Sequence, residues 1–205
     1  LMEANGLVYK TILPLVESRK VYRQQMTMLA KQAFSNITPA ASDPALPDSL
    51  FILGISRSGK TTLERIVGDM PGVKRGYENP IVELAMRRAS QRAGLLTIGS
   101  LLDLPRELGG DFTRNYVAEL KKRSGDAKIF TNTHPGRVSE VGVIAQLVPN
   151  AKFLFVYRNR EDTLLRILMK QYKQGTNAYA YSVEDALAEI DWYHGLMNHW
   201  HAQLP

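Results

Sequence analysis

The sequence predicts an α/β fold in which a parallel sheet is flanked by helices and preceded by an N-terminal helical segment. The first observation is the order of residues 49–67, where an apolar run leads into Gly-Ile-Ser-Arg-Ser-Gly-Lys-Thr at 54–61 and then into residues at helical spacing. A strand, a glycine-rich turn and a helix in this order are typical of a phosphate-binding loop. The second is that further apolar runs, at 127–131 and 151–157, are separated by helical patterns. Strands that alternate with helices form a parallel sheet, which here is P-loop-like.

The region before the loop divides into two parts. Residues 1–35 form a helical segment, because apolar residues recur at helical spacing from Leu7 to Phe34. Pro14 lies inside this pattern and indicates either a kink in one long helix or the break between two helices. Residues 36–48 are rich in Pro, Ala, Ser and Asp, which is typical of a linker, and residues 49–205 form the α/β domain.

Helices are expected at regular intervals along this domain. The loop helix spans about 60–69 and is stopped by Met70-Pro71-Gly72. The other helical patterns cover 81–93, 112–122, 138–147, 161–173 and 182–203. Gly109-Gly110 separates the first two of these. In the last of them Trp192, Tyr193, Leu196 and Trp200 recur at helical spacing, which predicts a core face.

The strands are fewer than the helices. The loop strand spans 49–54, and the others span 127–131 and 151–157. The strand at 151–157 is nearly all apolar, which favours burial on both of its faces. Three strands are few for such a sheet, so we expect that a C-terminal portion of the domain follows residue 205.

Composition limits the kinds of site that this chain can carry. The 205 residues have a net charge of +6 and include no cysteine. The charge suits an anionic partner, and the lack of cysteine excludes disulfides, thiol catalysis and Cys-zinc sites. No apolar run approaches the roughly 18 residues of a membrane span, and the first residues do not form a signal peptide, so a cytoplasmic location is the default expectation. The chain begins with Leu1 rather than Met, and we therefore expect an excised or processed piece.

The loop matches the pattern of nucleoside triphosphatases in full, including Lys60 and Thr61. Those enzymes also need a carboxylate at the end of a neighbouring strand, which holds magnesium. Neither strand end offers one, because Thr-Asn-Thr-His stands at 131–134 and Arg-Asn-Arg at 158–160. Arginines repel a metal and attract a second phosphate. The pattern therefore predicts a donor phosphorylated at two distant positions and no metal site.

These segments resemble the sulfotransferases that use 3′-phosphoadenosine-5′-phosphosulfate (PAPS). Residues 51–61 are similar to the family's donor loop, although Lys60 replaces a threonine. Residues 147–158, which begin Leu-Val-Pro-Asn-Ala-Lys-Phe and end Val-Tyr-Arg, are similar to its 3′-phosphate segment, and Tyr181 to Pro205 resembles the segment beyond. The resemblance covers about residues 49–205 and is closest to tyrosylprotein sulfotransferases and to bacterial sulfotransferases joined to tetratricopeptide repeats. It implies transfer of a sulfuryl group from PAPS to a hydroxyl or amine acceptor.

The resemblance also implies roles for individual residues. Arg57 would stabilise the bridging oxygen and the sulfuryl group, and Arg158 would bind the 3′-phosphate as a fork. Arg166 stands where the family often has a serine, and its guanidinium could still bind phosphate. The residues expected to bind the donor are Arg57, Ser58, Gly59, Lys60, Thr61, Thr62, Arg158 and Arg166.

The acceptor must lose a proton, so a base is needed within reach of it. Our choice is Glu78, in Gly-Tyr-Glu-Asn at 76–79, which matches the second glutamate of a Gly-Glu-Glu-Thr segment in tyrosylprotein sulfotransferases. His134 is the rival, because an imidazole titrates near neutral pH. Those enzymes carry a lysine that assists the leaving group at the position of Thr133, and we hypothesise that Lys60 takes over this task.

Two other functions stay open. One is an ATP- or GTP-dependent kinase or NTPase with an unusual magnesium site. The other is a degenerate domain that binds a nucleotide or a partner protein without catalysis, which Thr133 and Arg166 motivate. Nucleic-acid binding is not expected, since the scattered basic residues lack interleaved aromatics. No sequence motif indicates which acceptor is used or what the oligomeric state is.

Overall fold

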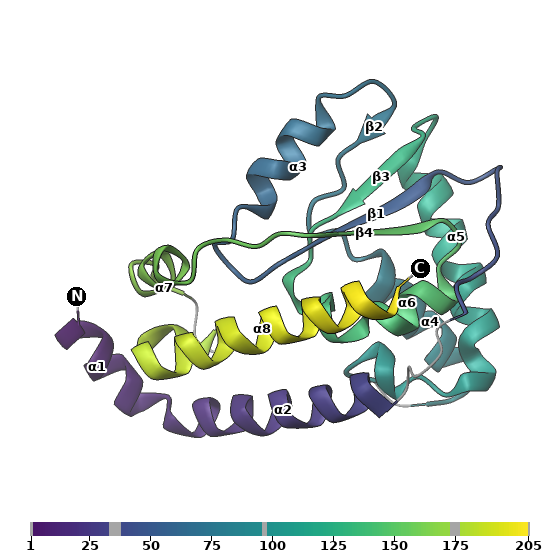
Figure 1. The fold of residues 1–205 in the computed structure, drawn as a ribbon. Coiled ribbons are helices and arrows are strands. Elements are labelled where there is room, and N and C mark those ends of the chain that lie inside the picture. The colour runs from purple at the N-terminus through teal and green to yellow at the C-terminus, as the bar shows by residue number, and fades with distance from the viewer. Residues whose placement is uncertain (1, 33–37, 96–97, 173–176, 205) are drawn as a thin grey trace.

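The computed structural model describes residues 2–32, 38–95, 98–172 and 177–204 and shows a parallel sheet flanked by helices (Figure 1). The strands are β1 (Asp48–Leu53), β2 (Val73–Lys74), β3 (Ile129–Asn132) and β4 (Ala151–Phe155), and they lie in the order β2-β3-β1-β4. In the central strand, Phe51 pairs with Asn132 on one side and with Phe153 on the other. The predicted α/β fold is confirmed. Its carboxyl strand ends place the loops after β1, β3 and β4 along one edge of the sheet.

Helices fill the connections between the strands. The loop helix α3 (Lys60–Gly68) follows β1, whereas α4 (Ile81–Arg92) and α5 (Gly109–Ser124) lie between β2 and β3. Helix α6 (Val141–Leu147) precedes β4, and α7 (Arg160–Leu168) and α8 (Val183–Gln203) follow it. Short 3₁₀ helices complete the chain at Leu101–Asp103, Arg106–Leu108, Pro135–Glu140 and Ala178–Tyr181.

The N-terminal segment forms two helices rather than one. Helix α1 (Met2–Thr11) ends before Ile12, and α2 (Leu13–Gln32) starts immediately after it. Pro14 lies in the first turn of α2, where its missing N–H leaves no helical bond unmade. Helix α2 runs beside α8 in the same direction (Figure 1), and Trp192 of α8 donates a hydrogen bond to Thr27 of α2. Tyr9 of α1 donates a hydrogen bond to Asp185 of α8.

Two expectations about strands are corrected. Strand β2 was not expected, because two residues are too short to show alternation. Strand β4 is not buried on both faces but lies at the edge of the sheet, and Lys152 is exposed while its apolar residues are partly buried. Among the described residues no strand covers its outer side, and a cavity of about 630 Å³ adjoins Phe153 and Phe155 there.

Helix boundaries also differ from the patterns. Gly109 and Gly110 begin α5 instead of separating two helices, and Phe112 anchors that first turn in the core. The helix expected over 161–173 ends at Leu168, and residue 173 lies outside the described residues. Residues 38–47 of the expected linker contain no helix or strand. Across the described parts of the chain, no helix is long and apolar enough to cross a membrane.

Candidate active site

The loop between β1 and α3 wraps around the backbone carbonyl of Ile55. That oxygen accepts the N–H of Ser58 at 3.2 Å and the ammonium group of Lys60 at 2.9 Å. Gly59 has a φ of +103°, a left-handed conformation that a side chain would strain. Arg57 also has a positive φ, of +69°, which is uncommon outside glycine and is often found at binding sites. The loop thus turns its backbone toward the N-terminus of α3.

A cavity of about 210 Å³ opens over this loop. Its lining contains every residue predicted to bind the donor except Ser58: Arg57, Gly59, Lys60, Thr61, Thr62, Arg158 and Arg166. Ser58 is buried beneath the loop, and its hydroxyl has no hydrogen-bond partner among the described residues. Four cationic side chains and the N-terminus of α3 converge on the cavity, an arrangement whose charge suits an anion.

Lys60 is the buried cation of this cavity, with 7% of its surface exposed. Burial lowers the pKa of its ammonium group to about 8, and the negative charge of Glu78 opposes part of that effect. Glu78 lines a cavity together with Ser56 of the loop, and its predicted role as the base stays a prediction. A negative ligand in the loop cavity would raise the pKa of Lys60 again.

Arg158 and Arg166 are brought together by a carboxylate that the sequence analysis missed. Asp162 accepts hydrogen bonds from Arg158 and, at 3.1 Å, from Arg166, and the two arginines lower the pKa of Asp162. Arg158 also reaches the backbone carbonyl of Arg57 at 3.4 Å, which ties it to the loop. A signal for Asp162 was present, because it stands four residues from each arginine on a predicted helix.

A second cavity has a volume of about 460 Å³. Glu78 and His134, the two predicted candidates for the base, both line it, together with Ser56 of the loop. The hydroxyls of Ser56 and Tyr172 are 3.0 Å apart at its wall. The structure therefore brings the loop and both candidate bases together.

The segment that carries Glu78 is fastened to α3 and β3. The backbone N–H of Tyr77 donates to the Glu64 carboxylate at 2.8 Å, and the same oxygen accepts the hydroxyl of Thr131. That hydroxyl in turn accepts the N–H of Gly76 at 3.0 Å. A Cβ atom on Gly76 would lie 2.2 Å from the Thr131 carbonyl, so only glycine allows this approach. Glu64 is fully buried and was not singled out in the sequence, because a glutamate on an amphipathic helix resembles any solvated one.

His134 is held by its neighbours in a way that occupies both nitrogens. Its Nδ1 accepts the N–H of Gly136 at 3.1 Å, and its Nε2 lies 3.4 Å from a carboxylate oxygen of Glu83. Burial lowers the pKa of His134, the Arg137 charge lowers it further, and Glu83 and Glu78 oppose them. The nitrogen that could take a proton is therefore engaged by the backbone, whereas no such bond engages Glu78 within the described chain.

Carboxylates and histidines do not gather elsewhere in a pattern suited to a metal. Within residues 2–32, 38–95, 98–172 and 177–204, no three such side chains form a group that could hold an ion. Thr133, which stands where the resembling enzymes carry lysine, is buried, and its N–H donates to the carbonyl of Tyr77 at 3.0 Å.

Several proteins are similar to this chain. A sugar kinase from Janibacter sp. HTCC2649, in an unliganded crystal structure, aligns over 78% of each chain with 16% identity and a TM-score of 0.37, a likeness too slight to argue from. A protein of Aquifex aeolicus (strain VF5), described as uncharacterized, is 25% identical over 164 residues, which are 76% of this chain and 22% of that protein. The chain thus spans about a fifth of that relative's length.

The family comparison covers most of the sequence. Residues 47–205 match the model of the sulfotransferase family, and this range includes the loop, the three arginines of the loop cavity and both candidate bases. The expected kinship to tyrosylprotein sulfotransferases in particular stays a prediction. On the strength of this match, the chain belongs to the sulfotransferase family.

Proposed function

We propose that this chain transfers a sulfuryl group from PAPS to a hydroxyl or amine acceptor. The observation that carries the proposal is the lining of the loop cavity, where Arg57, Lys60, Arg158 and Arg166 meet and where no described lining residue is a carboxylate. Such a lining suits a donor that brings negative charge at two positions and no metal ion of its own. The unpartnered hydroxyl of Ser58 beneath the loop also suits a bound phosphate oxygen.

The residues divide into a donor group and an acceptor group. Lys60, with Ser58, Gly59, Thr61 and Thr62, would hold the 5′-phosphosulfate end at the helix N-terminus. Arg158 and Arg166 would hold the 3′-phosphate after releasing Asp162. This exchange replaces one oxyanion by another at the same guanidinium groups, so the arginines are already placed for the ligand.

The chemical step is an in-line displacement. The acceptor oxygen or nitrogen forms a bond to sulfur while the bond between sulfur and the 5′-phosphate oxygen breaks. The acceptor proton passes to Glu78, and the electron pair of the broken bond leaves on 3′,5′-bisphosphoadenosine. Arg57 and Lys60 stabilise the charge that grows on the leaving oxygen, since fixed cations there lower the barrier. His134 is the weaker candidate for the base because its Nδ1 already accepts the Gly136 N–H.

One observation favours a second candidate, a domain that binds the nucleotide without transferring sulfate. Asp162 pairs with both arginines of the predicted 3′-phosphate site and so competes with a phosphate there, and Thr133 stands where the resembling enzymes carry lysine. An ATP- or GTP-dependent kinase is the third candidate, because the loop alone also fits a triphosphate.

Calorimetry separates the three. We expect 3′,5′-bisphosphoadenosine to bind at least about ten times more tightly than ATP, with no effect of magnesium, because two charge-assisted contacts to the 3′-phosphate are lost with ATP. Tighter binding of magnesium-ATP would establish the kinase. Tight binding of the bisphosphate without turnover of any acceptor in a library of phenols, sugars and amines would establish the binding domain. As a control, Arg160→Gln should leave these affinities unchanged, since Arg160 pairs with Asp191 and does not line the loop cavity.

A further inference from the structure

The second cavity is built in part by the N-terminal helix α2. Arg19 of this helix lines it, opposite Glu189 and Tyr193 of α8 and beside Tyr179. Helix α2 precedes the residues that match the family model. This part of the wall is therefore specific to the segment attached in front of the domain, and it lies in the cavity that also holds Glu78.

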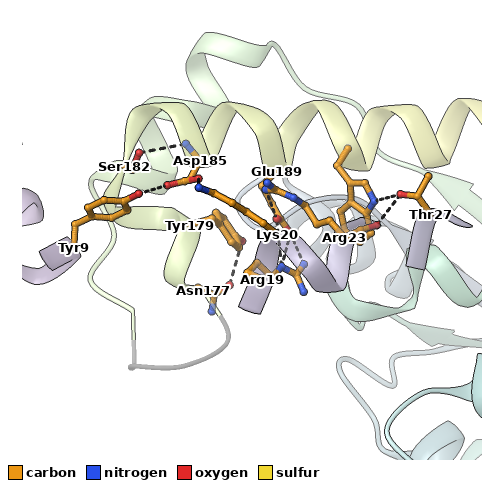
Figure 2. A network of polar contacts seen from close by, with 11 residues as sticks. Tyr9, Arg19, Lys20, Arg23, Thr27, Asn177, Tyr179, Ser182, Asp185 and Glu189 are labelled. Atoms are coloured by element: carbon orange, nitrogen blue, oxygen red, sulfur yellow. Dashed lines mark hydrogen bonds and ion pairs between the residues drawn. The ribbon is translucent and has the colours of Figure 1, made fainter. Parts of the chain in front are cut away.

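A buried cluster of charge fixes Arg19 in this wall. Figure 2 shows Arg19 and Arg23 reaching from α2 to the carboxylate of Glu189, which is fully buried. Nε of Arg19 lies 3.2 and 3.3 Å from the two carboxylate oxygens, and Nη1 of Arg23 lies 3.1 Å from one of them. Two guanidinium groups share one carboxylate, so one positive charge is left in excess. A further oxyanion would balance it.

Two hydrogen-bond donors of the cavity wall have no acceptor among the described residues. Nη1 of Arg19 and the hydroxyl of Tyr193 make no hydrogen bond with any described residue. Tyr193 is only 4% exposed, and burial raises its pKa, so the hydroxyl keeps its proton and remains a donor. Neither atom is among the fully buried unpartnered ones, so both are open to the cavity, where water or a ligand can accept their hydrogen bonds. Tyr193 belongs to the core, as predicted, and it also lines this cavity.

The two carboxylates of the lining act on different neighbours. Glu78 influences Lys60 and His134, whereas Glu189 influences Tyr193. The anionic group of a ligand bound at Arg19 would therefore lie near Glu189, whose charge is already paired with guanidinium groups. The reacting hydroxyl of that ligand would lie at Glu78.

We propose that this cavity is the acceptor site and that Arg19 and Tyr193 select a small hydroxylated acceptor that carries a carboxylate. The proposal rests on the sulfuryl transfer proposed above, for which it names the acceptor class. The cavity volume of about 460 Å³ suits a compound of one or two rings, and Tyr172, Tyr179 and Tyr193 provide aromatic faces for packing.

Matched pairs of acceptors test the proposal. Glucuronate against glucose, and 4-hydroxyphenylacetate against 4-hydroxyphenylacetamide, differ in the carboxylate and keep the hydroxyl. In the presence of 3′,5′-bisphosphoadenosine, binding of each probe is measured by calorimetry, and with PAPS the kcat/KM values are compared. The expected result is a preference of about ten-fold or more for the carboxylate member of a pair, since a charge-assisted hydrogen bond contributes on that order.

Three variants locate the preference. Arg19→Gln and Tyr193→Phe should each reduce the preference for the carboxylate acceptor at least several-fold. If the arginine variant fails to fold, Tyr193→Phe still tests the site, because it keeps the buried ring and removes only the hydroxyl. Arg23→Gln is the matched control, because Arg23 shares the bond to Glu189 but lines the outer groove of α2 instead of the cavity. This variant should lose stability and keep the preference.

Each outcome bears on one proposal. A wild-type protein that binds neither carboxylate probe, or that binds both members of each pair alike, overturns the assignment of Arg19. Equal loss of preference in the Arg23 variant also overturns it, because the effect would then follow from the ion cluster. Failure of 3′,5′-bisphosphoadenosine to bind the wild-type protein overturns the sulfuryl transfer instead, and the direct binding of the probes still reports on Arg19.

Discussion

The ammonium group of Lys60 lies 2.9 Å from the backbone carbonyl of Ile55, so the side chain folds back over its own loop. The charge sits in the interior of the phosphate-binding turn, where burial lowers its pKa to about 8. Among the described residues, the Ile55 carbonyl is the one hydrogen-bond acceptor of this cation. An incoming phosphate group supplies the partner that it lacks.

Binding of the donor should therefore be linked to proton uptake. Near pH 8.5 Lys60 is partly neutral in the free protein, and the phosphates of 3′,5′-bisphosphoadenosine raise its pKa, so a proton is taken up. Calorimetry at this pH in two buffers of different ionisation enthalpy measures the number of protons taken up on binding. Lys60→Met should remove the uptake and abolish sulfuryl transfer while the protein stays folded. Uptake of equal size in both proteins would assign the proton to another group.

The same lysine should make stability depend on pH. Its pKa is about 8 in the folded protein against 10.5 in the unfolded chain, so the unfolded chain holds more protons between these values. Stability should therefore rise as the pH increases from about 8 to 10.5, and the charged lysine costs about 3 kcal/mol below pH 8. Tyrosines titrate nearby, so the quantity to follow is the difference between wild type and Lys60→Met in urea unfolding. A difference that does not change with pH contradicts the burial of the charge.

Arg158 should determine the recognition of the 3′-phosphate. Arg158→Gln removes a guanidinium that faces the loop cavity, and we expect the affinity for 3′,5′-bisphosphoadenosine to fall about ten- to hundred-fold, toward that of AMP. The affinity for AMP, which lacks the 3′-phosphate, should hardly change. Equilibrium binding of both nucleotides measures this ratio, with Arg160→Gln as the control. A parallel loss for both nucleotides would place Arg158 at the 5′ end.

Glu78 should matter more for turnover than His134. Glu78→Gln keeps the size of the side chain and removes the base, so kcat should fall on the order of 10²- to 10⁴-fold with the donor affinity retained. His134→Asn should have a much smaller effect, because the imidazole acceptor nitrogen is already bonded to Gly136. Steady-state kinetics on both variants decide between them. The reverse ranking would make His134 the base.

Glu64 should act as a positioning residue for Glu78. Glu64→Ala leaves the Tyr77 N–H and the Thr131 hydroxyl without their shared acceptor, at a cost of about 1–3 kcal/mol for each buried group. We expect lower stability and a lower kcat at a nearly unchanged donor affinity. Glu64→Gln retains one acceptor oxygen and should rescue both quantities. A kcat that stays normal in the alanine variant would show that the Glu78 segment does not depend on this anchor.

Much of the donor site could be read from the sequence because its parts are local. The strand, the glycine turn and the helix that carry Lys60 are contiguous, and their spacing alone fixes a phosphate-binding geometry. Arg158 was found in the same way, since residues that follow parallel strands meet at one edge of the sheet. The family resemblance added Glu78, which lines one cavity with Ser56 of the loop and whose role stays a prediction.

The remaining features depend on contacts between distant segments. The sequence does not show that β4 lies at the sheet edge, because strand order is decided by which neighbours pack best and not by the hydrophobicity of one run. Helix α2 was recognised as a helix, but its register against α8 follows from contacts between distant residues, such as Arg19 with Glu189 and Thr27 with Trp192.

The sequence by itself determined the α/β class, the phosphate loop and the cations that meet over it, because these rest on short-range periodicity and turn chemistry. Only the tertiary structure decided that Asp162 occupies the two arginines, that Glu64 holds the segment of Glu78, and that Arg19 enters the second cavity. The physical reason is that burial and charge pairing are properties of neighbours in space. The residue type alone does not show whether a carboxylate is buried or solvated.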